Sequence, residues 1–302
     1  MNLTQILPLS IGGACVLLLF SAQCRQQTPS VAAPVTSIPV VPLPYDLNAP
    51  SLTISLATED LKEISALSPT SEPGVFLAVS DERGEIFFVD TRKDGAITKR
   101  VLFRGKGDFE GVEMVGDRIF CLKSNGIVFE ISNWQNGTPE VQEYPTMLQK
   151  ENDLEGLGYD PGRNALLLAC KENPESDVDR RIFAFDLGTH QLSAAPMYTI
   201  HPQEVNALVP YNDEDKKQHF FSSSGVAVHP LTQDVYVIST ALKRLLVLDH
   251  GSGQIRVAAR LKKSILPQPE GISFDPEGNL YISTEGKTGE GAILKFLYRS
   301  GQ

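Results

Sequence analysis

A short motif recurs at near-constant spacing along this chain, and the recurrence limits the folds that the chain can adopt. The five copies are ISAL at 64–67, FEGV at 109–112, LEGL at 154–157, SSGV at 223–226 and PEGI at 269–272. Their second residues, at 65, 110, 155, 224 and 270, are separated by 45, 45, 69 and 46 positions. Such a period predicts one supersecondary unit per copy, stacked against its neighbours.

Each copy opens a similar cycle of apolar strands and turns. A second strand is expected at 75–79, 119–122, 165–170, 235–238 and 280–282, and a third at 86–89, 127–131, 182–185, 245–248 and 293–297. Three of the third strands end in aspartate, at Asp90, Asp186 and Asp249. A more polar fourth strand completes the cycle. Four short strands in about 45 residues are typical of a β-propeller blade, so we predict an all-β, five-bladed propeller.

The longest spacing raises the alternative of a sixth blade. Its 24 extra residues map to 173–179 and 201–220, and neither stretch contains three apolar strands. We therefore interpret them as loop insertions. The last copy ends after its third strand, whereas an extra strand at 52–56 precedes the first copy. Pairing 52–56 with 293–297 would complete the last blade and remove both free sheet edges, giving a propeller domain over 50–302.

The N-terminal region has the pattern of an export signal. An apolar stretch at 6–20 is too short and interrupted for a membrane span, and it runs into a lipobox-like FSAQC ending at Cys24. We predict a signal peptide at 1–24, lipidation of Cys24, and a proline-rich tether at 25–49. The chain would then be anchored in the cell envelope, at the outer membrane facing the periplasm. The alternative is a soluble periplasmic or secreted protein.

The first strand of a propeller blade lines the central channel, so equivalent residues of the five copies should converge. One ring would contain Ser65, Glu110, Glu155, Ser224 and Glu270. A second ring, two positions earlier and on the same face by strand alternation, would contain Glu63, Asp108, Asp153, Ser222 and Gln268. Calcium binds six to eight oxygens, which the six acids of these rings could help to supply. The alternative is a water-filled polar channel without a fixed ion.

The order of several segments resembles the SdiA-regulated, YjiK-like family of bacterial envelope proteins. The matching segments are LKEISAL at 61–67, SDERGEI at 80–86, DLEGLGYDP at 153–161, KE at 171–172, SGV at 224–226, LLVLD at 245–249, QPEGI at 268–272 and GNLYI at 278–282. The resemblance implies a five-bladed propeller with a bound calcium ion, and a distant relation to NHL-repeat propellers, some of which are hydrolases. The chain departs from the family at Ser239-Thr240-Ala241, where relatives tend to carry Ser-Asp-Glu.

Composition and motifs exclude some functional classes but do not identify a ligand. A net charge of −10 with no basic cluster argues against nucleic acid. The five histidines are scattered, no nucleophile–base pair is evident, and the catalytic residues stay unknown. We favour a calcium-binding, monomeric module for a small molecule, a glycan or an envelope protein. The alternative is a metal-dependent hydrolase of small esters, lactones or phosphoesters, for which Asp81 and Glu285 are the best additional acids.

Overall fold

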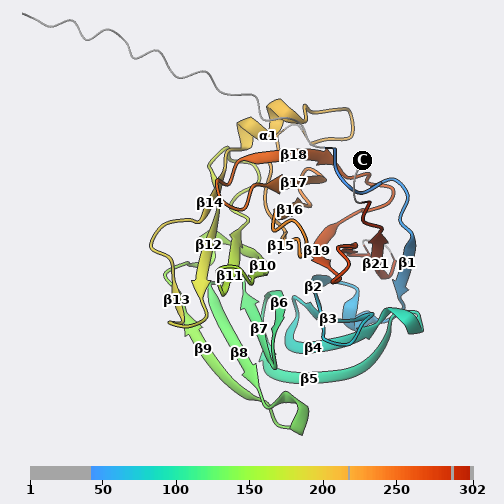
Figure 1. The fold of residues 1–302 in the computed structure, drawn as a ribbon, viewed down its shortest axis with the longest axis vertical. Coiled ribbons are helices and arrows are strands. Elements are labelled where there is room, and N and C mark those ends of the chain that lie inside the picture. The colour runs from blue at the N-terminus through green and yellow to red at the C-terminus, as the bar shows by residue number, and fades with distance from the viewer. Residues whose placement is uncertain (1–41, 217, 287–288, 300–302) are drawn as a thin grey trace, which may run out of the picture. The chain divides into compact units, whose positions relative to one another are not determined.

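The computed structural model describes residues 42–299, apart from 217 and 287–288. The predicted signal peptide, Cys24 and most of the predicted tether lie outside the described residues. In the part that is described, the chain folds into five small antiparallel sheets arranged as a five-bladed β-propeller, with very little helix (Figure 1). No helix within those ranges is long and apolar enough to cross a membrane.

Each sheet is one blade, and four of the blades follow the chain without interruption. Blade one is β2(Ile64–Pro69), β3(Val75–Ser80), β4(Arg83–Asp90) and β5(Ala96–Lys106), and blade two is β6(Phe109–Val115), β7(Arg118–Lys123), β8(Ile127–Ser132) and β9(Glu140–Pro145). Blade three is β10(Leu154–Asp160), β11(Ala165–Cys170) and β12(Arg180–Asp186), with β13(Gln191–Leu192) and β14(Tyr198–Ile200) both pairing with β12. Blade four is β15(Gly225–Val228), β16(Val235–Ser239), β17(Arg244–Leu248) and β18(Ile255–Arg260). The prediction of five blades is confirmed.

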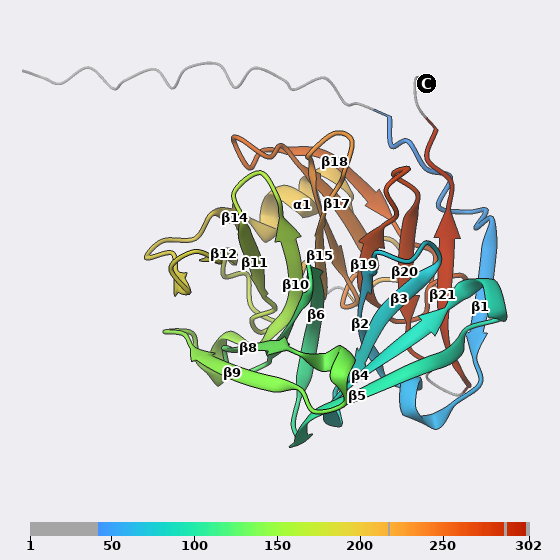
Figure 2. The same ribbon diagram turned by 60° about the horizontal axis from the view of Figure 1, so that its bottom comes forward.

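The fifth blade is closed by the N-terminal strand, as the sequence predicts. It contains β1(Leu52–Leu56), β21(Gly291–Phe296), β20(Leu280–Thr284) and β19(Pro269–Phe274), in that order across the sheet. The strands β1 and β21 are antiparallel, with Ile54 opposite Ile293, and they lie side by side in both views (Figure 2). The buried side chains of Ile54 and Leu56 belong to an apolar cluster that also contains Phe76 of blade one. The strand therefore joins the last blade to the first.

The long third spacing contains insertions and no sixth blade. The residues after β14 form the seven-residue helix α1(Pro202–Leu208) and then a loop that returns to β15, and 173–179 form a loop between β11 and β12. Single-turn 3-10 helices occur at Glu59–Leu61, Thr91–Lys93, Trp134–Asn136 and Lys150–Asn152. The insertions thus lie on blades three and four, and α1 lies beside β18 in Figure 1.

Packing onto the propeller begins before residue 50, within the segment predicted to be a tether. The side chains of Tyr45 and Leu47 are buried in the same apolar cluster as Phe274 and Phe296 of the fifth blade. The Tyr45 hydroxyl donates a hydrogen bond to the Gly278 carbonyl at 2.6 Å. Burying two large apolar side chains and satisfying the phenol hydroxyl gives this short stretch a fixed place on the domain.

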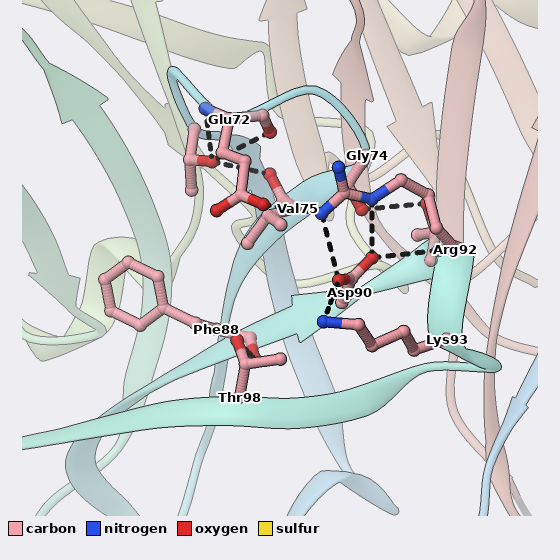
Figure 3. A network of polar contacts seen from close by, with 10 residues as sticks. Glu72, Gly74, Val75, Phe88, Asp90, Arg92, Lys93 and Thr98 are labelled. Atoms are coloured by element: carbon pink, nitrogen blue, oxygen red, sulfur yellow. Dashed lines mark hydrogen bonds and ion pairs between the residues drawn. The ribbon is translucent and has the colours of Figure 1, made fainter.

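The aspartates that end three third strands cap the turns that follow them. Asp90 accepts hydrogen bonds from the backbone N–H and the side chain of Arg92, and it also forms an ion pair with Lys93 (Figure 3). Asp186 and Asp249 likewise accept backbone N–H bonds from the residues two and three positions later. The repeated aspartate is therefore a turn-forming residue, because its short side chain satisfies backbone donors that leave the strand.

Candidate functional site

The structure brings the five residues of the predicted first ring to the centre of the propeller. The first strands of neighbouring blades contact one another around the axis in Figure 1. One small cavity there is lined by Ser65, Glu110, Glu155, Ser224 and Glu270, together with the apolar and glycine residues that follow them. Its volume is about 10 Å³, room for about one water molecule. The channel is therefore nearly closed at this level.

Irregular strand pairing, rather than simple alternation, sets the position of the ring residues. In blades one, two and three the register between the first and second strands shifts across Ser65, Glu110 and Glu155. In blade five the shift spans Glu270 and Gly271. An extra residue in a β-bulge is left out of the ladder, and bulges commonly re-aim a side chain next to a functional site. The acids are thus the unpaired residues of their strands.

A glycine follows four of the five ring residues, and Ala66 follows Ser65; these small residues allow the blades to meet at the axis. A side chain carbon on Gly225 would lie 2.5 Å from the Glu270 carbonyl oxygen of the next blade. One on Gly271 would lie 2.8 Å from the backbone nitrogen of Leu67, in blade one. Both distances are far below van der Waals contact, so only glycine permits this approach. The small residues of the repeat are therefore a packing requirement of the closed ring.

Lys171 supplies a positive charge to the glutamates of the first ring, a role that the repeat pattern does not predict. Its ammonium group donates a hydrogen bond to Glu155 and lies 3.9 Å from Asp153. Burial lowers the pKa of Lys171, but the attraction of Glu155 and the neighbouring acids outweighs burial and holds this pKa above its usual range. The pKa values of Glu110 and Glu270 are both raised. Burial is the larger cause, and repulsion from Glu155 is the second.

The acids of the second predicted ring lie just before the first strands of their blades, close to the residues of the first ring. Glu63, Asp108 and Asp153 directly precede β2, β6 and β10, so strand alternation does not apply to them. Their backbones pair instead with the residue that follows the second strand: Ser124 and Lys171 donate N–H bonds to the carbonyls of Asp108 and Asp153. After burial and repulsion from Glu155, a side-chain interaction with Asp108 also raises the pKa of Glu110, and Lys171 contacts both Asp153 and Glu155. These acids of the two predicted rings therefore lie close together.

Asp81, which the sequence analysis had noted as an additional acid, faces part of this second group. Burial is the main cause that raises its pKa to about 6, and repulsion from Glu63 and Asp108 adds to it. One carboxylate oxygen of Asp81 is buried and has no hydrogen-bond partner among the described residues. We call Glu63, Asp81, Asp108 and Asp153 the outer acids. Within the described ranges, no three His, Cys, Asp or Glu side chains are arranged to hold one metal ion.

A larger cavity of about 300 Å³ lies beside the central one and shares Ser224 with it. We call it the mouth pocket. It is lined by residues of the two insertions, by Lys171, by the turn from Thr240 to Arg244 and by the segment around Arg260 and Lys263. Two of the three serines at 222–224 line it, and neither donates to a base: Ser222 donates to the Lys171 carbonyl and Ser224 to the Pro269 carbonyl.

Buried arginines hold the insertions in place around the mouth pocket. Arg244, whose side chain is 1% exposed, donates to both carboxylate oxygens of Asp215 at 3.2 and 2.8 Å. Arg260 donates to Asp215 at 2.7 Å and also to the Pro210 carbonyl. Arg180 donates to the Phe221 carbonyl at 2.7 Å, next to Ser222 of the pocket lining. Because a bidentate guanidinium pair fixes both partners, the pocket wall is tied to the blades.

Comparison with known proteins places the chain in a family. The family model described as SdiA-regulated matches residues 50–287, and the chain belongs to this family. Among curated proteins, none matches the sequence.

Solved structures of low sequence identity share the propeller fold. Glutaminyl cyclase from Myxococcus xanthus has a TM-score of 0.54 at 12% identity, over 84% of this chain and 97% of that one. A luciferin-regenerating enzyme has a TM-score of 0.51 at 8% identity, over 83% and 96%. A Bacteroides thetaiotaomicron protein of unknown function has a TM-score of 0.48 at 11% identity, and this chain spans 54% of its length. At such identities the likeness concerns the fold alone.

Proposed function

We propose that the protein is a ligand-binding module anchored to the bacterial cell envelope, with its ligand site in the mouth pocket. The observation that carries this proposal is the construction of the pocket: the residues that lengthen the third repeat spacing form its wall, and buried arginines fix them. A volume of about 300 Å³ is at the lower end of the range for small-molecule sites. A small molecule therefore suits the site better than a glycan or a folded protein partner.

Binding is favoured over hydrolysis because the hydroxyl groups at the site already have other partners. Ser222 and Ser224 donate to backbone carbonyls, and the Thr240 hydroxyl donates to the Pro269 carbonyl. Nucleophilic catalysis by a hydroxyl needs a base within hydrogen-bonding reach of it. The enzymes that share the propeller fold are too distant in sequence for their chemistry to bear on this chain. The Glu270 carboxyl group also interacts with the Thr240 hydroxyl, but burial raises the pKa of this carboxyl group well above its usual range and favours the protonated form, which cannot act as a base.

Calcium binding stays a prediction, and the outer acids offer it better support than the glutamates of the first ring. Lys171 already neutralises part of the charge around Glu155. The unpartnered oxygen of Asp81, by contrast, belongs to a carboxyl group whose pKa is raised mainly by burial and further by repulsion from Glu63 and Asp108, with no cation among the causes that involve the described residues. A bound cation would remove that repulsion, with oxygen ligands from Asp81, Glu63 and Asp108 after these side chains close in.

Millimolar calcium is expected to raise the melting temperature of the protein. A cation that binds only the folded state stabilises it by mass action, and magnesium should act less strongly because it requires tighter octahedral geometry. Asp81→Asn should reduce the calcium response, and Glu155→Gln should reduce it less. Asp117→Asn, at an exposed turn in blade two, is the matched control. Melting curves that do not change between calcium and chelator would contradict the metal proposal.

The proposed anchor gives a separate expectation for Cys24. Cys24→Ser should transfer the protein from the membrane fraction to the soluble periplasm, because the acyl chains that hold it are attached to this residue. Fractionation with immunoblotting and mass spectrometry of the mature N-terminus would measure both effects. A wild-type protein that is already soluble and begins at another residue would contradict lipidation.

A further inference from the structure

The mouth pocket differs in charge from the rest of the molecule. The whole chain carries a net charge of −10, whereas the pocket lining contains six basic and two acidic side chains. The basic residues are Lys171, Lys216, Lys243, Arg244, Arg260 and Lys263. Of the two acids, Asp215 is already neutralised by two arginines, which hold its pKa at about 2 against the opposing effect of burial. The potential in the pocket is therefore positive within an acidic protein.

The pocket also offers donors and apolar contact. The Nε–H group of Arg244 is buried and has no hydrogen-bond partner among the described residues. The other two nitrogens of its guanidinium group donate to Asp215, so Arg244 belongs to the wall of the pocket, and the lysines of the lining are more exposed donors than Arg244. Leu242, Leu261 and Pro174 provide an apolar part of the lining. The site thus combines a cationic part with a hydrophobic part.

We propose that the mouth pocket binds a small organic anion whose phosphate or carboxylate group lies among the basic side chains that line the pocket. This inference rests on the proposed binding function and names the chemical class of its ligand. The apolar part of the ligand lies against Leu242 and Leu261. The carboxylates around the channel axis repel the anion, so it stays in the pocket and does not enter the channel.

Neighbouring lysines allow a matched test of the proposal. Lys263 lines the pocket, whereas the adjacent Lys262 is exposed and lies outside it. Replacing either residue by glutamate changes the net charge by the same amount, so the pair separates a local contact from general electrostatic attraction. Isothermal titration calorimetry on the purified full-length protein would use phenyl phosphate and benzoate as anionic probes, benzyl alcohol as a neutral probe and benzylamine as a cationic one.

The anions are expected to bind, with a preference between them that reveals whether phosphate or carboxylate is the better group. Lys263→Glu should weaken their binding by roughly five- to tenfold, and Lys262→Glu by less than about twofold. Equal effects of the two variants, or tighter binding of benzyl alcohol or benzylamine than of the anions, would overturn the anion assignment and leave a ligand-binding function standing. If none of the four probes binds, both the anion assignment and the proposed pocket function are contradicted.

Discussion

Replacing Leu56 by alanine is expected to lower the free energy of unfolding of the whole domain by about 2–5 kcal/mol. The side chain of Leu56 is 1% exposed and lies in the apolar cluster shared by blades five and one. Its removal leaves a cavity at the joint that closes the ring, where neighbouring backbones are held by strand pairing and cannot easily collapse. Denaturant unfolding followed by circular dichroism would measure the change.

Leu52 provides a matched control in the same strand. It is 41% exposed, so Leu52→Ala should change the free energy of unfolding by no more than about 0.5 kcal/mol. Both substitutions remove the same atoms from β1 and affect strand propensity similarly. Equal losses of stability would show that Leu56 contributes through the strand backbone alone and that closure does not depend on this packing.

Lys171→Met is expected to destabilise the protein by about 2–4 kcal/mol at neutral pH. The substitution leaves Glu155 buried, near Glu110 and Glu270, without its cationic partner. The loss of stability should be smaller than that expected for breaking a fully buried ion pair, because the Lys171 side chain is 32% exposed. Adding Glu155→Gln to Lys171→Met should restore much of the stability, because the unpaired charge is then removed. Lys123→Met, at the end of the corresponding strand β7, is the control.

The pH dependence of this variant gives a second measure of the same interaction. Burial raises the folded-state pKa of Glu155 to about 7 although Lys171 opposes this shift. Without Lys171 the opposition is lost, so protonation of Glu155 favours the folded variant. That contribution is fully present below the unfolded pKa and is lost as pH rises through the folded pKa. The difference in free energy of unfolding between the wild type and Lys171→Met should therefore shrink as pH falls from about 8 to about 5. A difference that is constant over this range would exclude buried carboxylates as its cause.

The repeated positions account for most of what could be predicted from the sequence. Residues that recur at a fixed period predict the blade count, the strand order and the closing strand. They also predict that three glutamates meet at the axis, Glu110, Glu155 and Glu270. Lys171 could not be found in this way because it belongs to one blade, and the equivalent positions hold Asp81, Ser124, Thr240 and Glu285. A comparison of the residues that follow each second strand would have shown the one basic member among them.

The remaining differences have local physical causes. The bulges that displace Ser65, Glu110 and Glu155 leave no pattern in hydrophobicity, since they add an unpaired residue without changing which residues are apolar. The insertions carry no repeat, so the pairing of Asp215 with Arg244 was not evident from spacing. Tyr45 and Leu47 stand among prolines, and their burial depends on an apolar surface that exists only after the fifth blade has formed.

The pairing of the two ends of the domain has a consequence for the order of events during synthesis and export. Ser51 and Lys295 are hydrogen-bonded although they are 244 positions apart. A chain that leaves a ribosome or a secretion channel N-terminus first exposes β1 before any blade is complete, and its partner strand β21 emerges only after the first four blades. Until then β1 is an unpaired strand edge, open to association with other chains. Ring closure is therefore a late, long-range step, and holding the nascent chain apart from its neighbours should improve the yield of folded protein.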